Sequence, residues 1–328
     1  MMEKQVSTGK KSRLKKAIIY VICALMAALV PLFVHSVYYL HILILIFIYI
    51  IVTSSLRTIA NSGQISLGHA SFMGIGAYTS AVLAKQLGWT PWITMPLGGF
   101  ATMAIAILVG YPFSRLRTIY FSMVSLFFGI GMIAVNTIFS KVTGGYFGLI
   151  GIWPLFGRSK VPYYYFFLGL TLLCLLILHR LENCRIGMSL RAIDQSHEVA
   201  ASVGINEAGY RVLALAVGCF VAGLAGAGYA HYNLVLSQGS FDLLASINLL
   251  VYMMVGGVGS FAGPVIGAAV LIFIPELFRG LKQFTPYVFA GVLLLVIFVM
   301  PRGFVGLPAQ IKSWINRRRE AKEDRVAS

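Results

Sequence analysis

The sequence predicts an all-α protein, a polytopic transmembrane helical bundle of about ten spans. Three observations support this class. Apolar residues make up 59% of the 328 positions and charged residues 11%, whereas soluble domains have about 45–50% and about 25%. Apolar runs of roughly 20 residues, the length that crosses a bilayer, recur along the chain. Twenty of the 26 Lys and Arg residues fall on one predicted side, as the positive-inside rule requires.

This composition excludes a soluble enzyme and a disordered chain. A net charge of +16 would suit a nucleic-acid binder, but the basic residues lie at the chain ends and in loops and form no single face. We therefore expect membrane lipid around the protein and no nucleic-acid partner. Residues 1–16 are basic, and the apolar run that follows exceeds the about 7–15 residues of a signal core. It is predicted as a retained first span.

Two of the predicted spans are irregular. The third contains the stretch 61–71, which is too polar to face lipid. The eighth and ninth are separated only by residues 259–264, so they could form one broken helix or a re-entrant pair. An alternative with eight spans plus re-entrant segments therefore stays open. The ten predicted spans are 17–35, 37–56, 64–84, 91–113, 119–139, 162–179, 211–232, 245–261, 263–279 and 285–300.

The even number of spans places both termini on the cytoplasmic side. Three parts follow from this layout: a basic N-terminal segment at 1–16, a transmembrane domain at 17–306, and a basic tail at 307–328. The longest internal cytoplasmic loop is 180–210. The loops 140–161 and 233–244 lie outside the membrane on the opposite side.

The acidic residues bear on how such a protein could be energised. Ion-coupled transporters usually place Asp or Glu inside the membrane, and of the ten acids only Glu276 falls clearly within an apolar run. No Walker-type nucleotide motif is present, so ATP energy would have to come from another subunit. A secondary transporter and a passive channel remain as alternatives. Scattered cysteines and the lack of ligand-like spacings predict no disulfide framework, no metal and no catalytic residue.

The loop 180–210 contains a candidate docking helix. Residues from Met188 to Val203 have helical periodicity, and Gly204 is suited to end the helix with a left-handed residue. A short amphipathic helix of this kind fits a groove on a partner protein, or it lies on the lipid surface. Its apolar face is formed by Leu190, Ile193, His197 and Ala201, and a neighbouring charged face by Arg191, Asp194 and Glu198.

The polar stretch 61–71 is a candidate substrate path. Gln64, Ser66 and His69 need hydrogen-bond partners at membrane depth. A water-filled path would supply them, and hydrogen bonds between helices are the alternative. Small residues recur in this stretch and in 218–228 and 256–264, which predicts close helix packing.

The same stretch resembles a known family. Residues 63–78 are similar to the signature G-Q-x-S-L-G-H-A-x-F-x-G-x-G-A-Y of LivM-type permeases of branched-chain amino acid ABC importers. Further ordered similarities lie at 120–126 (Y-F-A-x-V-T-L), 143–149 (T-G-G-x-x-G-L), 185–204 (the cytoplasmic loop) and 256–264 (G-G-x-G-S-x-x-G-P). Together they extend over about residues 56–306.

The resemblance implies a type II ABC importer-like permease of the cell (inner) membrane. It implies a second homologous permease, two cytoplasmic ATPases that use the ATP, and an extracytoplasmic substrate-binding protein; this chain itself binds no cofactor. Closely similar permeases carry urea or short amides, so that substrate class stays open. By this resemblance the ATPase-coupling residues are Arg191, Asp194, Glu198, Ala201 and Gly204, although Glu198 lies one position earlier than the Glu of the importer pattern E-A-A-x-x-x-G. The candidate substrate-path residues are Gln64, Ser66, His69 and Tyr146.

Overall fold

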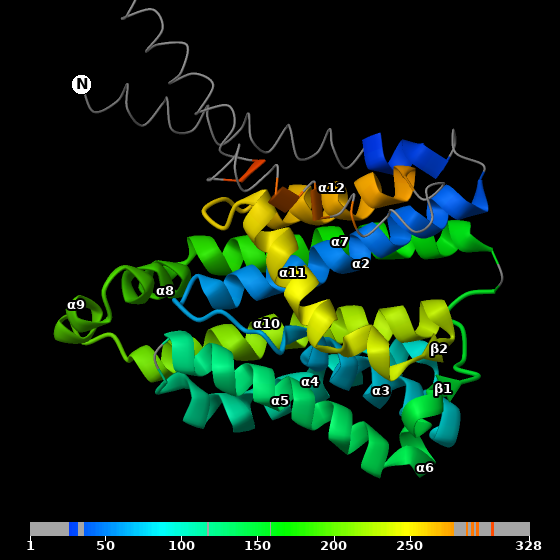
Figure 1. The fold of residues 1–328 in the computed structure, drawn as a ribbon, viewed down its shortest axis with the longest axis horizontal. Coiled ribbons are helices and arrows are strands. Elements are labelled where there is room, and N and C mark those ends of the chain that lie inside the picture. The colour runs from blue at the N-terminus through cyan, green and yellow to red at the C-terminus, as the bar shows by residue number, and fades with distance from the viewer. Residues whose placement is uncertain are drawn as a thin grey trace, which may run out of the picture.

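The chain folds into a bundle of long helices, as predicted (Figure 1). The basic segments predicted at 1–16 and 307–328 lie outside the described residues, as do most of the predicted spans 17–35 and 285–300. The computed structural model describes residues 26–31, 36–116, 118–157 and 159–278, together with 287, 290–291, 293–294 and 303–304.

Six stretches within the described residues are long and apolar enough to cross a membrane. They are α2, α4, α5, α7, α10 and the stretch Gln238–Gly256, and each matches a predicted span. The helices are α2 (Val37–Ala60), α3 (His69–Leu87), α4 (Pro91–Ser114), α5 (Thr118–Ile138), α6 (Ser140–Thr143), α7 (Lys160–Asn183), α8 (Arg185–Gln195), α9 (His197–Ser202), α10 (Glu207–Asn233), α11 (Leu243–Gly256) and α12 (Gly263–Leu277), with the 3-10 turns η1 (Gly145–Phe147) and η2 (Gln238–Phe241) and the strands β1 (Leu149–Ile150) and β2 (Val235–Leu236).

The bundle has two distinct ends. Helices α8 and α9 lie at one, which we call the α9 end, and α6 with the β1–β2 pair lies at the other, the β end (Figure 1). The pair is antiparallel, with Leu149 opposite Leu236, and it joins the two loops predicted to share one side of the membrane. Helix α10 packs against α2, α3 and α4. The apolar window of α10 is 67% buried and that of α5 only 11%, so α5 is peripheral.

Glycines bring α3, α4 and α10 into backbone contact, as the recurring small residues predicted. A Cβ atom added at Gly226 of α10 would lie 2.0 Å from the carbonyl oxygen of Met73 in α3. One added at Gly76 would lie 2.4 Å from Cα of Gly223. Neither position can accept a larger residue without separating the helices, and such close approach is how helices gain packing contacts in lipid.

The third predicted span, 64–84, differs from the structure. Helix α3 begins only at His69, and residues 61–68, here called the extended segment, are not helical. Their burial alternates strictly, with the even-numbered residues buried, which is the period of an extended chain. The extended segment runs from the end of α2 back towards the middle of the bundle, where α3 starts (Figure 1). This course through the bundle is compatible with the re-entrant arrangement considered for this part of the chain.

The predicted helix from Met188 to Val203 is also different, because it is two helices. Ser196 adopts φ −161° and ψ 111° between α8 and α9, and its side chain accepts a hydrogen bond from the Val199 N–H. A serine that caps a new helix in this way competes with continuation of the old one. Gly204 has the expected left-handed φ of 81° after α9.

Helices α11 and α12 are separate and pack against each other, so residues 259–264 do not lie within one broken helix. Gly257, at φ 105°, opens the turn between them. Helix α12 has 15 residues, fewer than the roughly 20 that cross a bilayer. Of the eight spans predicted within the described part, α3 and α12 are the two that depart from simple spanning helices.

Candidate functional site

A row of hydroxyl groups on α5 holds the backbone of the extended segment. Backbone groups outside a helix need protein partners at membrane depth, because lipid offers none. The hydroxyls are spaced four and three residues apart, on one face of α5, and at 1.5 Å per residue they cover about 10 Å of the helix. The bonds run from Thr118 Oγ1 to the Gly63 carbonyl (2.8 Å), from Ser122 Oγ to the Ile65 carbonyl (2.7 Å) and from the Leu67 N–H to Ser125 Oγ (3.0 Å).

The three predicted path residues of this region are all buried. Gln64, Ser66 and His69 are 1%, 0% and 0% exposed. Gln64 Nε2, Ser66 Oγ and His69 Nδ1 have no hydrogen-bond partner among the described residues. A buried polar group without a hydrogen-bond partner costs about 1–3 kcal/mol. These three atoms can therefore bind water or a polar ligand.

The proton of His69 can be assigned from its neighbour. His69 Nε2 lies 2.9 Å from Ser55 Oγ, and the Ser55 hydroxyl donates to the Val52 carbonyl at 2.7 Å. Nε2 is therefore assigned the proton that it donates to Ser55. The unpartnered Nδ1 is then a hydrogen-bond acceptor inside the bundle.

A cavity of about 460 Å³ lies between the extended segment and the α9 end. Charged groups line it. Arg211 forms an ion pair with Glu207 at 2.5 Å and donates to the Ser62 carbonyl at 3.4 Å. Loss of solvent raises the pKa of the Asp194 carboxyl above its ordinary value. The lining includes Gly63, Ile65, Asp194, His197, Glu207 and Arg211.

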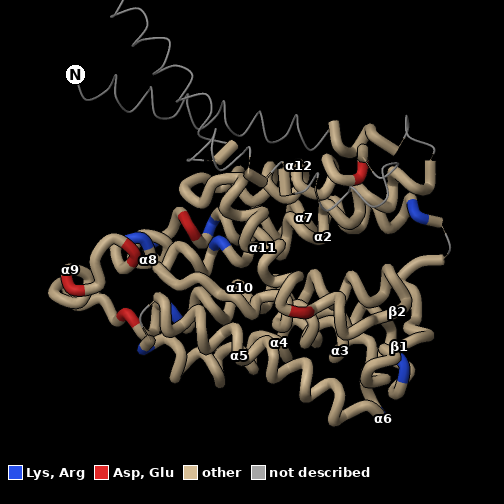
Figure 2. Tube along the Cα trace, in the orientation of Figure 1, with Lys and Arg blue, Asp and Glu red and all other residues tan. Residues whose placement is uncertain are grey.

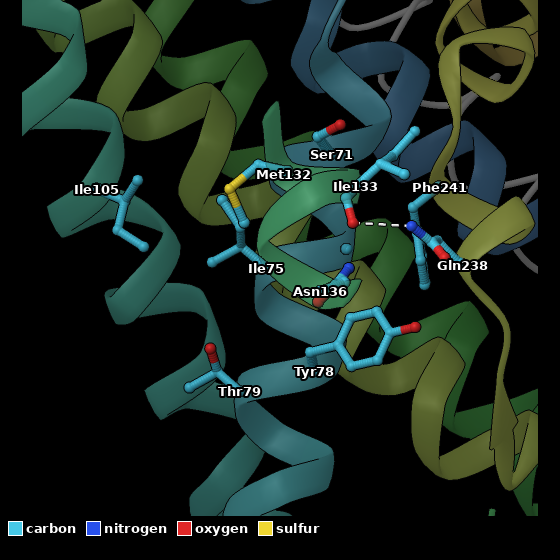
Figure 3. A pocket seen from close by; sticks show the side chains of 11 residues that line it. Ser71, Ile75, Tyr78, Thr79, Ile105, Met132, Ile133, Asn136, Gln238 and Phe241 are labelled. Carbon is cyan, nitrogen blue, oxygen red and sulfur yellow. Dashed lines mark hydrogen bonds between the residues drawn. The ribbon is translucent and has the colours of Figure 1, made fainter. Parts of the chain in front are cut away.

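A second cavity, of about 190 Å³, lies beyond the extended segment, between α3, α5 and η2 (Figure 3). Its polar and apolar side chains come from these three elements and, at Ile105, from α4. Gln238 Nε2 donates to the Ile133 carbonyl at 2.8 Å, which ties η2 to α5. The lining includes Ser71, Gly74, Tyr78, Ile133, Asn136 and Gln238.

A buried ion pair joins three helices near the α9 end. Arg57 of α2 pairs with Glu182 of α7, and its Nε donates to the Val258 carbonyl at 2.8 Å, in the turn between α11 and α12. The Arg57 guanidinium also lies 5.8 Å from the centre of the Phe261 ring. Arg191 of α8 donates to the Glu182 carbonyl at 3.0 Å. The ion pair therefore connects the bundle to α8.

The predicted coupling residues gather at the α9 end, where charged residues of both signs are concentrated (Figure 2). Glu198, Ala201 and Gly204 are exposed on α9 and the turn after it. Val199 and Val203 are 64% and 70% exposed, although both are apolar. Because α8 and α9 are separate helices, the predicted apolar face is wrong in part. Leu190 and Ile193 are buried, Ala200 takes the buried place on α9, and His197 and Ala201 are exposed.

Tyr146 does not join the other path residues. It lies in η1 at the β end (Figure 1) and is 85% exposed, beside Phe147 at 90%. The extended segment contacts the start of α5, whereas η1 follows its end. Tyr146 therefore belongs to the surface of the β end.

The chain was compared with known proteins. The family model described as "Branched-chain amino acid transport system / permease component" matches residues 38–301. The chain belongs to this family. It is 28% identical over 289 residues to the permease protein LivM of a high-affinity branched-chain amino acid transport system from Salmonella typhimurium, covering 79% of this chain and 68% of that protein.

Other relatives include both LivM and LivH. LivM of Escherichia coli K12 is 27% identical over 289 residues, again 79% of this chain and 68% of the relative. LivH of the same strain, also a permease protein of a high-affinity branched-chain amino acid transport system, is 25% identical over 274 residues, 75% of this chain and 87% of LivH. No solved structure matches this chain. This permease is thus a multi-pass membrane transport subunit and not an enzyme.

Sequence reasoning located the extended segment of the permease but missed two features around it. The first is the hydroxyl row on α5, whose signal is the spacing of Thr118, Ser122 and Ser125 on an otherwise apolar helix. The second is the ion pair of Arg57 and Glu182. Both residues lie just beyond the ends of predicted spans, and no sequence signal links two positions so far apart.

Proposed function

We propose that this permease subunit imports a branched-chain amino acid through the cell (inner) membrane as one of two paired permeases. Two separate cytoplasmic ATPases hydrolyse the ATP, and this chain binds no cofactor. An extracytoplasmic binding protein delivers the amino acid at the β end. Similarity to both LivM and LivH, two permease proteins of one kind of transport system, supports the pairing.

The distribution of basic residues supports this orientation. Arg57, Arg180, Arg191 and Arg211 belong to helix ends or helices near α8 and α9, whereas Lys85 donates to the Ile150 carbonyl in β1. The excess at the α9 end favours a cytoplasmic α9 end by the positive-inside rule. An even number of spans then places both termini in the cytoplasm.

The observation that carries the proposal is the exposed surface of α9. Val199 and Val203 are one helical turn apart and both largely exposed, and Glu198 stands beside them. An exposed apolar pair with one carboxylate beside it, on a short protruding helix, fits a groove on a cytoplasmic partner. Gln64, Ser66 and His69 are assigned to the substrate path, and Arg191, Asp194, Glu198, Ala201 and Gly204 to the ATPase contact.

The positions of the carboxylates favour ATP, rather than an ion gradient, as the energy source for transport. Within the part of the chain that the structure describes, Glu182 is the only buried carboxylate. It is already paired with Arg57, so it is poorly placed to carry a proton or sodium ion across the membrane.

The test is a charge placed on α9. We expect Val199→Glu with Val203→Glu to abolish co-purification of the ATPases and to lower ATP-dependent uptake at least tenfold, the scale of a lost central contact. The second permease should still co-purify. Val161→Glu, at a half-exposed position of α7 near the β end, is the matched control and should retain the ATPases. A double variant that keeps both ATPases and uptake would overturn the docking assignment.

A further inference from the structure

The cavity between α3, α5 and η2 has no charged side chain in its lining. Its wall is apolar where Ile75, Met132, Ile133 and Phe241 meet, and polar where Asn136 and Gln238 face it (Figure 3). This differs from the cavity near the α9 end, which Asp194, Glu207 and Arg211 line. A ligand with a net charge would meet no counter-charge here, so the lining selects for a molecule that is neutral overall.

The polar groups of this cavity retain hydrogen-bonding capacity. The Tyr78 hydroxyl is buried without a partner in the described part of the chain. The Asn136 side-chain amide has no hydrogen bond to any described residue, and the Gln238 amide nitrogen is fixed by the Ile133 carbonyl while its carbonyl oxygen has no described partner. Amide and phenol groups include both donors and acceptors, so together they can hydrogen-bond a carboxylate and an ammonium.

The volume restricts the size of the ligand. About 190 Å³ is less than the roughly 300–1,000 Å³ of pockets that hold drug-sized molecules. It suits a small molecule with a short branched apolar group against the isoleucine, methionine and phenylalanine side chains. A large aromatic side chain would require neighbouring residues to move.

The cavity lies directly beside the extended segment. Ser71 and Gly74, which follow that segment, line this cavity, whereas Gly63 and Ile65 at its start line the cavity near the α9 end. The buried Gln64, Ser66 and His69 belong to the stretch between them. The two cavities therefore lie towards the two ends of one stretch of backbone, which hydroxyl groups of α5 hold by hydrogen bonds.

We propose that the cavity between α3, α5 and η2 is a substrate-binding site within the permease, specific for a small net-neutral amino acid with a branched aliphatic side chain. This inference rests on the proposed import function. Ile133 and Met132 contact the aliphatic group, and Asn136, Gln238 and Tyr78 meet the ammonium and carboxylate. The extended segment separates this site from the charged cavity at the α9 end.

The experiment changes the size of the site in both directions in the complete transporter, reconstituted with its partners in proteoliposomes. Ile133→Trp fills the cavity and should lower leucine uptake at least tenfold. Ile133→Ala enlarges it and should raise the ratio of phenylalanine to leucine uptake about tenfold, the scale for one or two methylenes in an apolar pocket. Val135→Trp and Val135→Ala are matched controls, because Val135 lies two residues away on α5, is 40% exposed and does not line the cavity.

The outcomes separate the two proposals. If the unmodified transporter moves another solute but no branched-chain amino acid, the import assignment fails. Loss of that solute's uptake in Ile133→Trp, without loss in the Val135 variants, would then still support the cavity as the substrate site. If leucine uptake is present and neither Ile133 variant changes its rate or selectivity, the site is refuted. Effects of equal size in the Val135 variants would also refute it. Co-purification of the partners verifies that each variant is folded.

Discussion

Removal of the Glu182 carboxylate should be among the most destabilising single changes in the described bundle. The side chains of Arg57 and Glu182 are only 8% and 10% exposed. Glu182→Met therefore leaves a buried guanidinium without its counter-charge, which costs about 3–5 kcal/mol. At about 2 °C per kcal/mol for longer chains, the Tm should fall by roughly 6–10 °C.

The double variant Arg57→Met, Glu182→Met distinguishes this cause from simple loss of packing. It removes both charges, so the penalty of the unpaired guanidinium disappears. What remains is the Val258 carbonyl, which loses the Arg57 Nε–H, at about 1–3 kcal/mol for a buried acceptor. The double variant should therefore be more stable than Glu182→Met alone. Thermal unfolding of the purified complex measures both, with Lys141→Met, at an exposed position of α6, as a control expected within about 0.5 kcal/mol of the parent. A double variant less stable than the single one would refute the reasoning.

Two further predictions concern the extended segment and the cavity at the α9 end. Ser122→Ala removes the donor to the Ile65 carbonyl and should lower the unfolding free energy by about 1–3 kcal/mol. The control Ser189→Ala removes a hydrogen bond within exposed α8 and should change the Tm little. Equal Tm values for the two variants would contradict the role of the hydroxyl row. Because desolvation raises the pKa of the Asp194 carboxyl above its ordinary value, its contribution to stability is greatest below that ordinary pKa and falls as pH rises through the raised pKa. Asp194→Asn should therefore keep or raise the Tm at pH 7 and flatten its pH dependence between pH 4 and 8, and a lower Tm at pH 7 would argue against desolvation as the cause.

The long apolar helices could be predicted from the sequence because their signal is local. In α2 and α10, an apolar run of sufficient length is enough to specify a helix in a bilayer. The extended segment was predicted only as a stretch unsuited to lipid. Its conformation depends on Thr118, Ser122 and Ser125, more than fifty residues later, and no periodicity within residues 61–68 contains that information.

The break between α8 and α9 could have been predicted, because Ser196 is a capping residue type in the middle of a short helical pattern. The periodicity through Leu190 and Ile193 does not continue past Ser196. The prediction that His197 and Ala201 are buried is therefore wrong, and Ala200 is buried instead. For the candidate path, in contrast, the sequence located residues that are buried. Gln64, Ser66 and His69 were chosen because they are polar at membrane depth, and the structure places them in the interior, while the cavity beyond them required the tertiary arrangement.

The hydroxyl row on α5 has a consequence for biogenesis. Thr118 follows Gly63 by 55 residues, so at about 5–20 residues per second the ribosome finishes the extended segment several seconds before its partner helix emerges. During that interval the backbone of residues 61–68 has none of its α5 hydrogen bonds and is a poor substrate for release into lipid. We therefore expect α2 and α3 to be retained until α5 arrives, so that these helices enter the bilayer as one group rather than one at a time.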